Sequence, residues 1–123
     1  MTKILIVDDE EYILDLLVAV FNDIKDIEIL CARDGREALS IADINIPDIV
    51  LLDAKLPKLD GYEVCKFIKK DPAMAHTKVL MISGMTQKSD LIKAREAGVD
   101  DYISKPFTST VLIERVEKVL RRI

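Results

Sequence analysis

The sequence predicts a doubly wound α/β fold in which five parallel strands, in the order 2-1-3-4-5, are covered by five helices. Short apolar runs alternate with segments of helical periodicity along all 123 residues, and no linker rich in Gly, Ser or Pro interrupts them. Three runs are continuously apolar, as in strands buried on both faces. Another run carries Glu28 and a fifth is very short, as is common in edge strands. We therefore expect one domain over residues 1–123.

Each element has a local justification. The expected strands are 3–7, 27–32, 49–52, 79–82 and 102–103. The first helix is expected from Glu11 to Ile24, where apolar side chains recur at helical spacing. Asp34 is the expected cap of the second helix. The third helix must stop before Pro72, because the proline ring cannot continue it. The fourth is expected to end at Gly98, which adopts a left-handed cap without strain, and the fifth to contain residues 112–120.

Composition narrows the possible partners and the cellular compartment. The net charge of −4 and the pI near 5.0 argue against nucleic acid or an anionic membrane as a direct partner. Cys31 and Cys65 lie in apolar contexts, which predicts reduced thiols and a cytoplasmic location. The apolar stretch at the N-terminus is too short for a signal peptide, and no run approaches membrane-spanning length.

Polar residues follow four of the predicted strands at the point where each strand ends. These residues are Asp8, Asp9, Asp53, Ser83 and Lys105. In an open parallel sheet the carboxyl ends of the strands share one edge, and ligands bind where the strand order reverses. We expect that reversal between the first and third strands, which places Asp8 and Asp9 beside Asp53. Three carboxylates, a hydroxyl and an ammonium are suited to hold a divalent metal and a phosphoryl group.

On these residues the chain resembles the receiver domain of two-component response regulators, over essentially its full length. The motifs that carry the resemblance are Ile4-Leu5-Ile6-Val7-Asp8-Asp9-Glu10, Leu51-Leu52-Asp53, Leu56-Pro57-Lys58-Leu59-Asp60-Gly61, Ser83-Gly84, Gly98-Val99-Asp100-Asp101-Tyr102 and Lys105-Pro106-Phe107. Each fragment alone is weak, but all of them in order at strand ends are specific. Chemotaxis regulators and single-domain sporulation phosphorelay proteins are the nearest types.

The resemblance implies a flavodoxin-like fold and a role for each group. Asp53 is the implied phosphoacceptor, and Ser83 and Lys105 contact the phosphoryl group. Tyr102 is the implied aromatic switch residue, which acts together with Ser83. The peptide bond between Lys105 and Pro106 is cis in typical receivers.

The metal preference follows from the residue types. Three neighbouring carboxylates repel one another, and a bound divalent cation relieves that repulsion. Mg²⁺ binds through one or two carboxylates plus phosphate oxygens, and Mn²⁺ is a possible substitute. We expect Asp9, Asp53 and the main-chain carbonyl of Lys55 as direct ligands, with Asp8 acting through water.

The first predicted helix has more apolar residues than one stripe buries against a sheet. These are Ile13, Leu14, Leu16, Leu17, Val18, Val20 and Phe21. Receivers dock their histidine donors along this helix, so we expect a histidine kinase or phosphotransfer domain to contact Ile13 and either Leu16 or Leu17. The alternative is a core that wraps further round the helix.

Two positions depart from the common receiver pattern. Lys55 stands two residues after Asp53, as in single-domain sporulation-type relay proteins, and Met85 stands two residues after Ser83. The Lys55 ammonium could pair with the phosphoryl group and obstruct attacking water, while Met85 offers no polar group to orient that water. Both suggest a long-lived phosphoryl group.

Three function classes follow. The first is a stand-alone phosphoacceptor switch, not an enzyme acting on other substrates, with self-catalysed phosphoryl transfer and dephosphorylation and a downstream protein target. The second is the receiver half of a longer regulator, such as a DNA-binding transcription factor with an output domain. The third is an aspartate-nucleophile phosphatase, which the pattern disfavours because Lys55 replaces the second aspartate that such enzymes use.

Overall fold

The computed structural model describes residues 1–84 and 87–121. The strands are β1 (Thr2–Val7), β2 (Ile27–Ala32), β3 (Ile49–Asp53), β4 (Lys78–Ser83) and β5 (Asp101–Ser104). The helices are α1 (Glu11–Asn22), α2 (Gly35–Asn45), α3 (Gly61–Lys70), α4 (Lys88–Ala97) and α5 (Ser109–Arg121), with a 3-10 helix η1 (Pro72–Met74). Strands and helices alternate as the sequence predicts.

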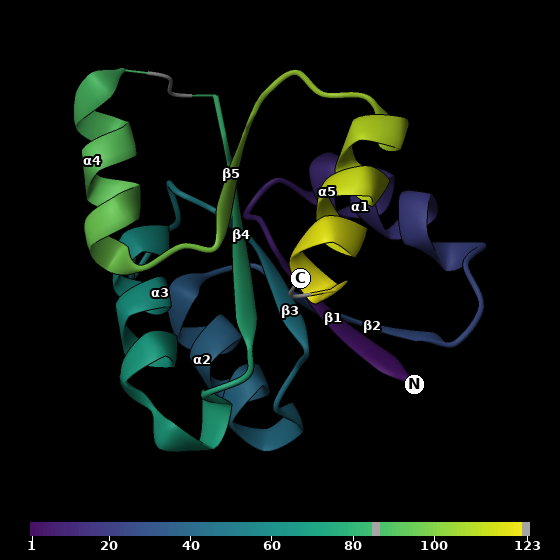
Figure 1. The fold of residues 1–123 in the computed structure, drawn as a ribbon, viewed down its shortest axis with the longest axis horizontal. Coiled ribbons are helices and arrows are strands. Elements are labelled where there is room, and N and C mark those ends of the chain that lie inside the picture. The colour runs from purple at the N-terminus through teal and green to yellow at the C-terminus, as the bar shows by residue number, and fades with distance from the viewer. Residues whose placement is uncertain (85–86, 122–123) are drawn as a thin grey trace.

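The five strands form one parallel sheet in the order β2-β1-β3-β4-β5. Helices α1 and α5 cover one face of the sheet, and α2, α3 and α4 cover the other (Figure 1). The predicted doubly wound, flavodoxin-like fold is therefore confirmed. The strand order reverses between β1 and β3, which pair directly with each other.

The alternation of side chains along the central strands divides the core in two. In β1, Leu5 and Val7 face α2, α3 and α4, whereas Ile4 and Ile6 face α1 and α5. The same alternation runs through β3 and β4. Because both faces are covered, all these side chains are fully buried, which explains why the central strands are continuously apolar.

The helix ends follow the local chemistry. The Asp34 side chain accepts a hydrogen bond from the N–H of Glu37 and caps α2 as predicted, and Gly98 ends α4 in the left-handed conformation. Helix α1 ends at Asn22, two residues earlier than expected. Its helical spacing continues to Ile24, but the chain must turn there to enter β2, and Asp26 takes a positive φ of 63° in that turn.

The two cysteines are free, as predicted, with Cys65 fully buried and Cys31 half-buried. Within residues 1–84 and 87–121, no helix is both long and apolar enough to cross a membrane.

Helix α2 supports the loop between β3 and α3 at a close approach. The N–H of Gly35 donates to the carbonyl of Pro57, and a Cβ atom on Gly35 would lie 2.0 Å from the carbonyl oxygen of Leu59. Backbone cannot yield to such a contact as the end of a flexible side chain can. Glycine is therefore required at this position by packing.

We expect Gly35→Ala to lower the free energy of unfolding by roughly 1–3 kcal/mol, the usual cost of overpacking a close contact. Gly84→Ala is the matched control, because a Cβ there meets no atom within 4 Å. Urea denaturation of both variants measures the difference. Equal stability of the two variants would show that the loop moves aside at little cost.

Candidate functional site

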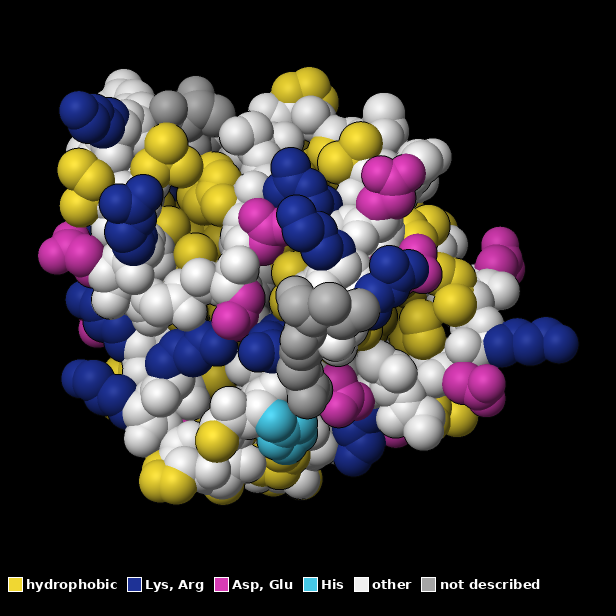
Figure 2. All heavy atoms as spheres, in the orientation of Figure 1, with side chains coloured by type: hydrophobic (Ala, Val, Ile, Leu, Met, Phe, Trp, Pro, Cys, Tyr) yellow, Lys and Arg dark blue, Asp and Glu magenta, His cyan; other side chains and the backbone are white. Residues whose placement is uncertain are grey.

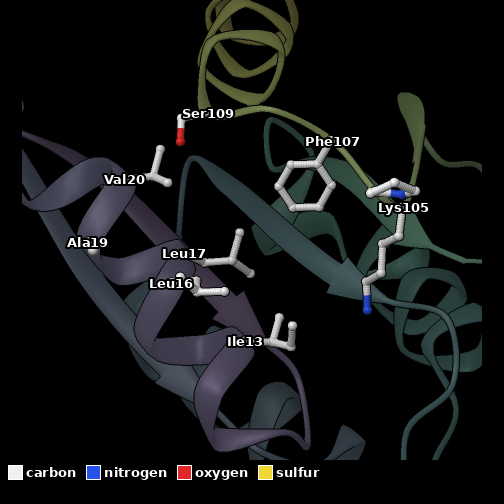
Figure 3. A pocket seen from close by; sticks show the side chains of 9 residues that line it. Ile13, Leu16, Leu17, Ala19, Val20, Lys105, Phe107 and Ser109 are labelled. Carbon is white, nitrogen blue, oxygen red and sulfur yellow. The ribbon is translucent and has the colours of Figure 1, made fainter.

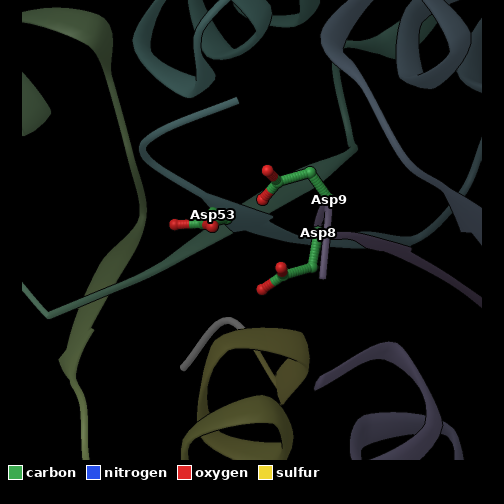
Figure 4. Close-up of side chains that lie close together, drawn as sticks. All are labelled: Asp8, Asp9 and Asp53. Carbon is green, nitrogen blue, oxygen red and sulfur yellow. The ribbon is translucent and has the colours of Figure 1, made fainter. Parts of the chain in front are cut away.

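The three predicted carboxylates meet at the carboxyl edge of the sheet. Asp8 and Asp9 follow β1 and Asp53 ends β3, and the pairing of Val7 with Leu52 sets these strand ends side by side. One oxygen from each carboxylate lies within 4.8 Å of the other two (Figure 4). The topology alone brings together residues separated by more than 40 positions in the chain.

Lys105 supplies the positive charge. Its ammonium lies 3.6 Å from Asp8 Oδ2 and 3.9 Å from Asp53 Oδ2. Asp8 is buried, and its Oδ1 also accepts a hydrogen bond of 2.9 Å from the N–H of Glu10. Asp9 is exposed. Asp8 is thus already engaged by protein groups, whereas the Asp9 carboxylate is open to a ligand.

Burial raises the pKa values of two of the acids, Asp8 and Asp53. Burial raises the pKa of Asp53 to about 6; the ammonium of Lys105 opposes this rise, and the charge of Asp8 adds to it. Burial also raises the pKa of Asp8, against the lowering effect of the hydrogen bond from Glu10. One ammonium therefore does not compensate for the desolvation and mutual repulsion of these acids.

Ser83 and Tyr102 lie where the sequence places them. Ser83 ends β4 and is buried, and it follows Ile82, the residue paired with Asp53. Its carbonyl accepts a 2.8 Å hydrogen bond from the N–H of Lys105, a residue joined to Pro106 by a cis peptide bond as predicted. Tyr102 lies on β5 and packs against the core beneath α3 and α4.

The loop after β3 and the start of α3 pack closely against Asp53. The N–H of Lys55 lies 3.4 Å from Asp53 Oδ1, and the Lys55 side chain is exposed. Gly61 permits the start of α3 to approach, because a Cβ there would lie 2.2 Å from the carbonyl oxygen of Asp53. Met85, the other residue tied to phosphoryl lifetime, lies outside the described residues, so the long lifetime stays a prediction.

The donor set fits a hard divalent cation. The cluster of Asp8, Asp9 and Asp53 offers only carboxylate oxygens, the ligand type that Mg²⁺ and Mn²⁺ prefer. Its raised pKa values indicate negative charge that the protein alone leaves uncompensated. An acidic cluster that can hold such a metal is thus present at the predicted residues.

A groove lies beside this cluster, between α1 and the loop after β5 (Figure 3). It encloses about 650 Å³, and its walls include Ile13, Leu16, Lys105 and Phe107. Leu16 is 60% exposed, whereas Leu17 is buried in the core. Leu17 also lines the groove, but its side chain is mostly covered, so Leu16 is the more accessible of the two predicted contacts. Phe107 was predicted only as part of a motif, and its place in the groove depends on how the loop folds back over α1.

Helix α4 carries a second exposed apolar surface. Figure 2 shows hydrophobic side chains over α4, at the left, among lysine and arginine side chains. Leu91 and Ile92 on this helix are each nearly half exposed.

Comparison with known proteins decides the family. The model of the response regulator receiver domain matches residues 4–117. The chain belongs to the response regulator receiver family. Its resemblance at the sequence motifs is thereby confirmed, and the phosphatase alternative has no support. This receiver is 41% identical over 121 residues to the alkaline phosphatase synthesis transcriptional regulatory protein PhoP of Bacillus subtilis, covering 98% of the chain and 49% of that protein.

Solved structures of response regulator proteins are also similar to this chain. A putative response regulator from Chloroflexus aurantiacus is similar with a TM-score of 0.90 and 34% identity, covering 98% of each chain. The chemotaxis protein CheY4 of Vibrio cholerae is similar with a TM-score of 0.89 and 28% identity, covering 97% of this chain and 98% of the other. The receiver spans about half the length of the curated relatives it matches.

The raised pKa of Asp53 has a consequence for stability without metal. A carboxyl group whose folded pKa of about 6 exceeds its unfolded value stabilises the fold fully below about pH 4, and this contribution is lost as the pH rises through about 6. Between pH 4 and 7 in EDTA, we expect the unfolding free energy of the wild type to fall relative to that of Asp53→Asn by up to about 3 kcal/mol.

Urea denaturation of both proteins at several pH values measures this difference. Adding Mg²⁺ should restore wild-type stability at neutral pH, because metal competes with the proton for the same oxygens. A difference between the two proteins that stays constant from pH 4 to 7 would contradict the assigned environment of Asp53.

Proposed function

We propose that this receiver accepts a phosphoryl group on Asp53 from a histidine kinase or a histidine phosphotransfer domain, and that this changes the surface it offers to a downstream protein target or output domain. The observation that carries the proposal is the cluster of Asp8, Asp9, Asp53 and Lys105 at the strand ends of a family that serves as signalling switches. The receiver unit extends over residues 1–123.

The residues divide the chemistry between them. Above its pKa of about 6 the Asp53 carboxylate is ionised, and burial leaves it poorly solvated and thus a better nucleophile. One of its oxygens forms a bond to phosphorus as the bond from phosphorus to the donor imidazole breaks, and the electron pair returns to the imidazole nitrogen. Lys105 neutralises charge on the transferred oxygens, and the Ser83 hydroxyl donates to them. The receiver thus catalyses its own phosphorylation. It also catalyses the later hydrolysis of the phosphoryl group from Asp53.

The proposed metal ligands are Asp9, Asp53 and the main-chain carbonyl of Lys55, with Asp8 acting through water. The exposed Asp9 carboxylate and the hydrogen-bonded Asp8 carboxylate support this division. Mg²⁺, when bound, supplies positive charge to the phosphoryl oxygens.

The switch couples the site to the surface. Ser83 moves toward the phosphoryl group, and Tyr102 turns inward on the neighbouring strand. The surface that changes is formed by α4, β5 and α5, where Leu91 and Ile92 are exposed.

Two forms of the whole protein remain in view. The stand-alone form is supported by similarity to a chemotaxis protein over nearly the full length of both chains. The form with an output domain is supported by relatives of about twice the length, among them a protein named as a transcriptional regulator. In either form we propose a cytoplasmic location, which the free thiols support, and no direct contact of this domain with nucleic acid or membrane.

The acceptor role is tested with acetyl phosphate and Mg²⁺. We expect the wild type to gain one hydroxylamine-labile phosphoryl group by intact-mass spectrometry, and Asp53→Asn to gain none, because an amide oxygen is not a nucleophile here. Chelation by EDTA should abolish labelling of the wild type. Labelling of Asp53→Asn at the wild-type rate would remove Asp53 from the role.

The donor contact is tested at Leu16. With the histidine kinase that labels the wild type fastest in a screen of the host's kinases, we expect Leu16→Ala to lower kcat/KM for phosphotransfer roughly five- to thirtyfold, as for a central interface residue. Labelling by acetyl phosphate should not change, since Leu16 touches none of the reacting groups.

Ile44→Ala is the matched control, because Ile44 is 81% exposed on α2, on the other face of the sheet. If Leu16→Ala and Ile44→Ala transfer equally well, the donor docks elsewhere.

A further inference from the structure

Two buried polar atoms near the acceptor site lack hydrogen-bond partners. In the part of the chain that the structure describes, these are the hydroxyl of Tyr62 and Oδ2 of Asp90. Tyr62 lies in the first turn of α3, and Asp90 lies in the first turn of α4. Asp90 is only 5% exposed. Buried polar groups are nearly always paired, so each orphan needs a physical explanation.

The two residues face the same space. Both line a cavity of about 470 Å³ between the loop after β3 and α4, which is also lined by Asp9 and Lys55. Lys93, one turn after Asp90, holds its ammonium 5.9 Å from the centre of the Tyr62 ring. Burial raises the pKa of Tyr62, and the charges of Tyr102 and Asp90 raise it further. The phenol therefore lies within electrostatic reach of the switch tyrosine and of the buried acid.

The pair is chemically complementary. A phenol hydroxyl donates, and a carboxylate oxygen accepts; the resulting bond is of the stronger, charge-assisted kind. Neither atom is exposed to water in the present arrangement, and no described residue satisfies either of them. An approach of the two helices across the cavity that brings these atoms into contact would satisfy both at once.

We propose that Tyr62 and Asp90 form a latch between α3 and α4: the Tyr62 hydroxyl donates a hydrogen bond to Asp90 when Asp53 is phosphorylated, and the two atoms stay unpaired, as in the arrangement described here, when it is not. The proposal rests on the proposed role of Asp53.

Tyr62 and Asp90 are each linked along the chain to a residue at the acceptor site, which indicates which way phosphorylation would move them. Asp90 stands seven residues after Ser83, and Tyr62 directly follows Gly61, whose backbone packs against the carbonyl of Asp53. Movement of Ser83 toward a phosphoryl group on Asp53 would draw the first turn of α4 toward β3, and so toward the start of α3. The latch thus makes phosphorylation and the position of α4 favour each other.

Beryllofluoride, which stands in for the phosphoryl group on Asp53, supplies the test. Tyr62→Phe removes only the hydroxyl. We expect this variant to raise the urea midpoint of the unloaded protein, because an unpaired buried hydroxyl is removed, and to weaken beryllofluoride binding roughly three- to tenfold, because the loaded state loses a bond. A residue with only a packing role would not be expected to raise stability and weaken beryllofluoride binding in the same variant.

Asp90→Asn and the double variant complete a cycle in which the two effects on beryllofluoride affinity should be non-additive. Asp43→Asn, at an exposed position in the last turn of α2, is the control and should change neither measurement. The latch is overturned if Tyr62→Phe binds beryllofluoride as the wild type does, or if it lowers unloaded stability, since the hydroxyl would then already be paired. Failure of the wild type itself to bind beryllofluoride would instead count against the role of Asp53.

Discussion

The burial of acidic side chains at one edge of the sheet is the constraint on which the rest of the molecule depends. One oxygen from each of Asp8, Asp9 and Asp53 lies within 4.8 Å of the others, and the ammonium of Lys105 lies near two of them, Asp8 and Asp53. Such an arrangement persists only because the strands that carry it are fixed by burial on both faces. The same negative charge suits the site to a divalent cation, whose positive charge would offset it.

The two faces of the sheet divide the work of a receiver. The groove beside α1 opens on the face covered by α1 and α5, whereas the cavity between α3 and α4 lies on the opposite face. The cluster of carboxylates sits at the edge common to both. Under the proposed function, a donor bound in the groove beside α1 would leave α4, on the opposite face, free to respond.

Local patterns in the sequence were enough to predict the strand order and the meeting of the site residues. Both depend on features with short range: apolar runs, a capping aspartate, and polar residues at strand ends. The exposure of Leu16 and the burial of Leu17 could not be predicted in this way, because a broad apolar stripe does not fix the rotation of a helix. Nor could Tyr62 and Asp90 be linked, since each fits its own helix as an ordinary core aromatic or first-turn acid. Their proximity depends on how α3 packs against α4.

Hydrogen bonds among described residues anchor the far end of α4. The N–H of Gly98 donates to the carbonyls of Ala94 and Arg95, and the Asp100 carboxylate joins Lys69 of α3 to the N–H of Val79 in β4. In the proposed latch, this anchor is the pivot about which α4 tilts. A ten-residue helix is about 15 Å long, so a tilt of about 10° about the pivot displaces its first turn by about 2–3 Å while its last turn stays in place. Under the proposed latch, such a tilt would move the first turn of α4, which carries Asp90, relative to α3.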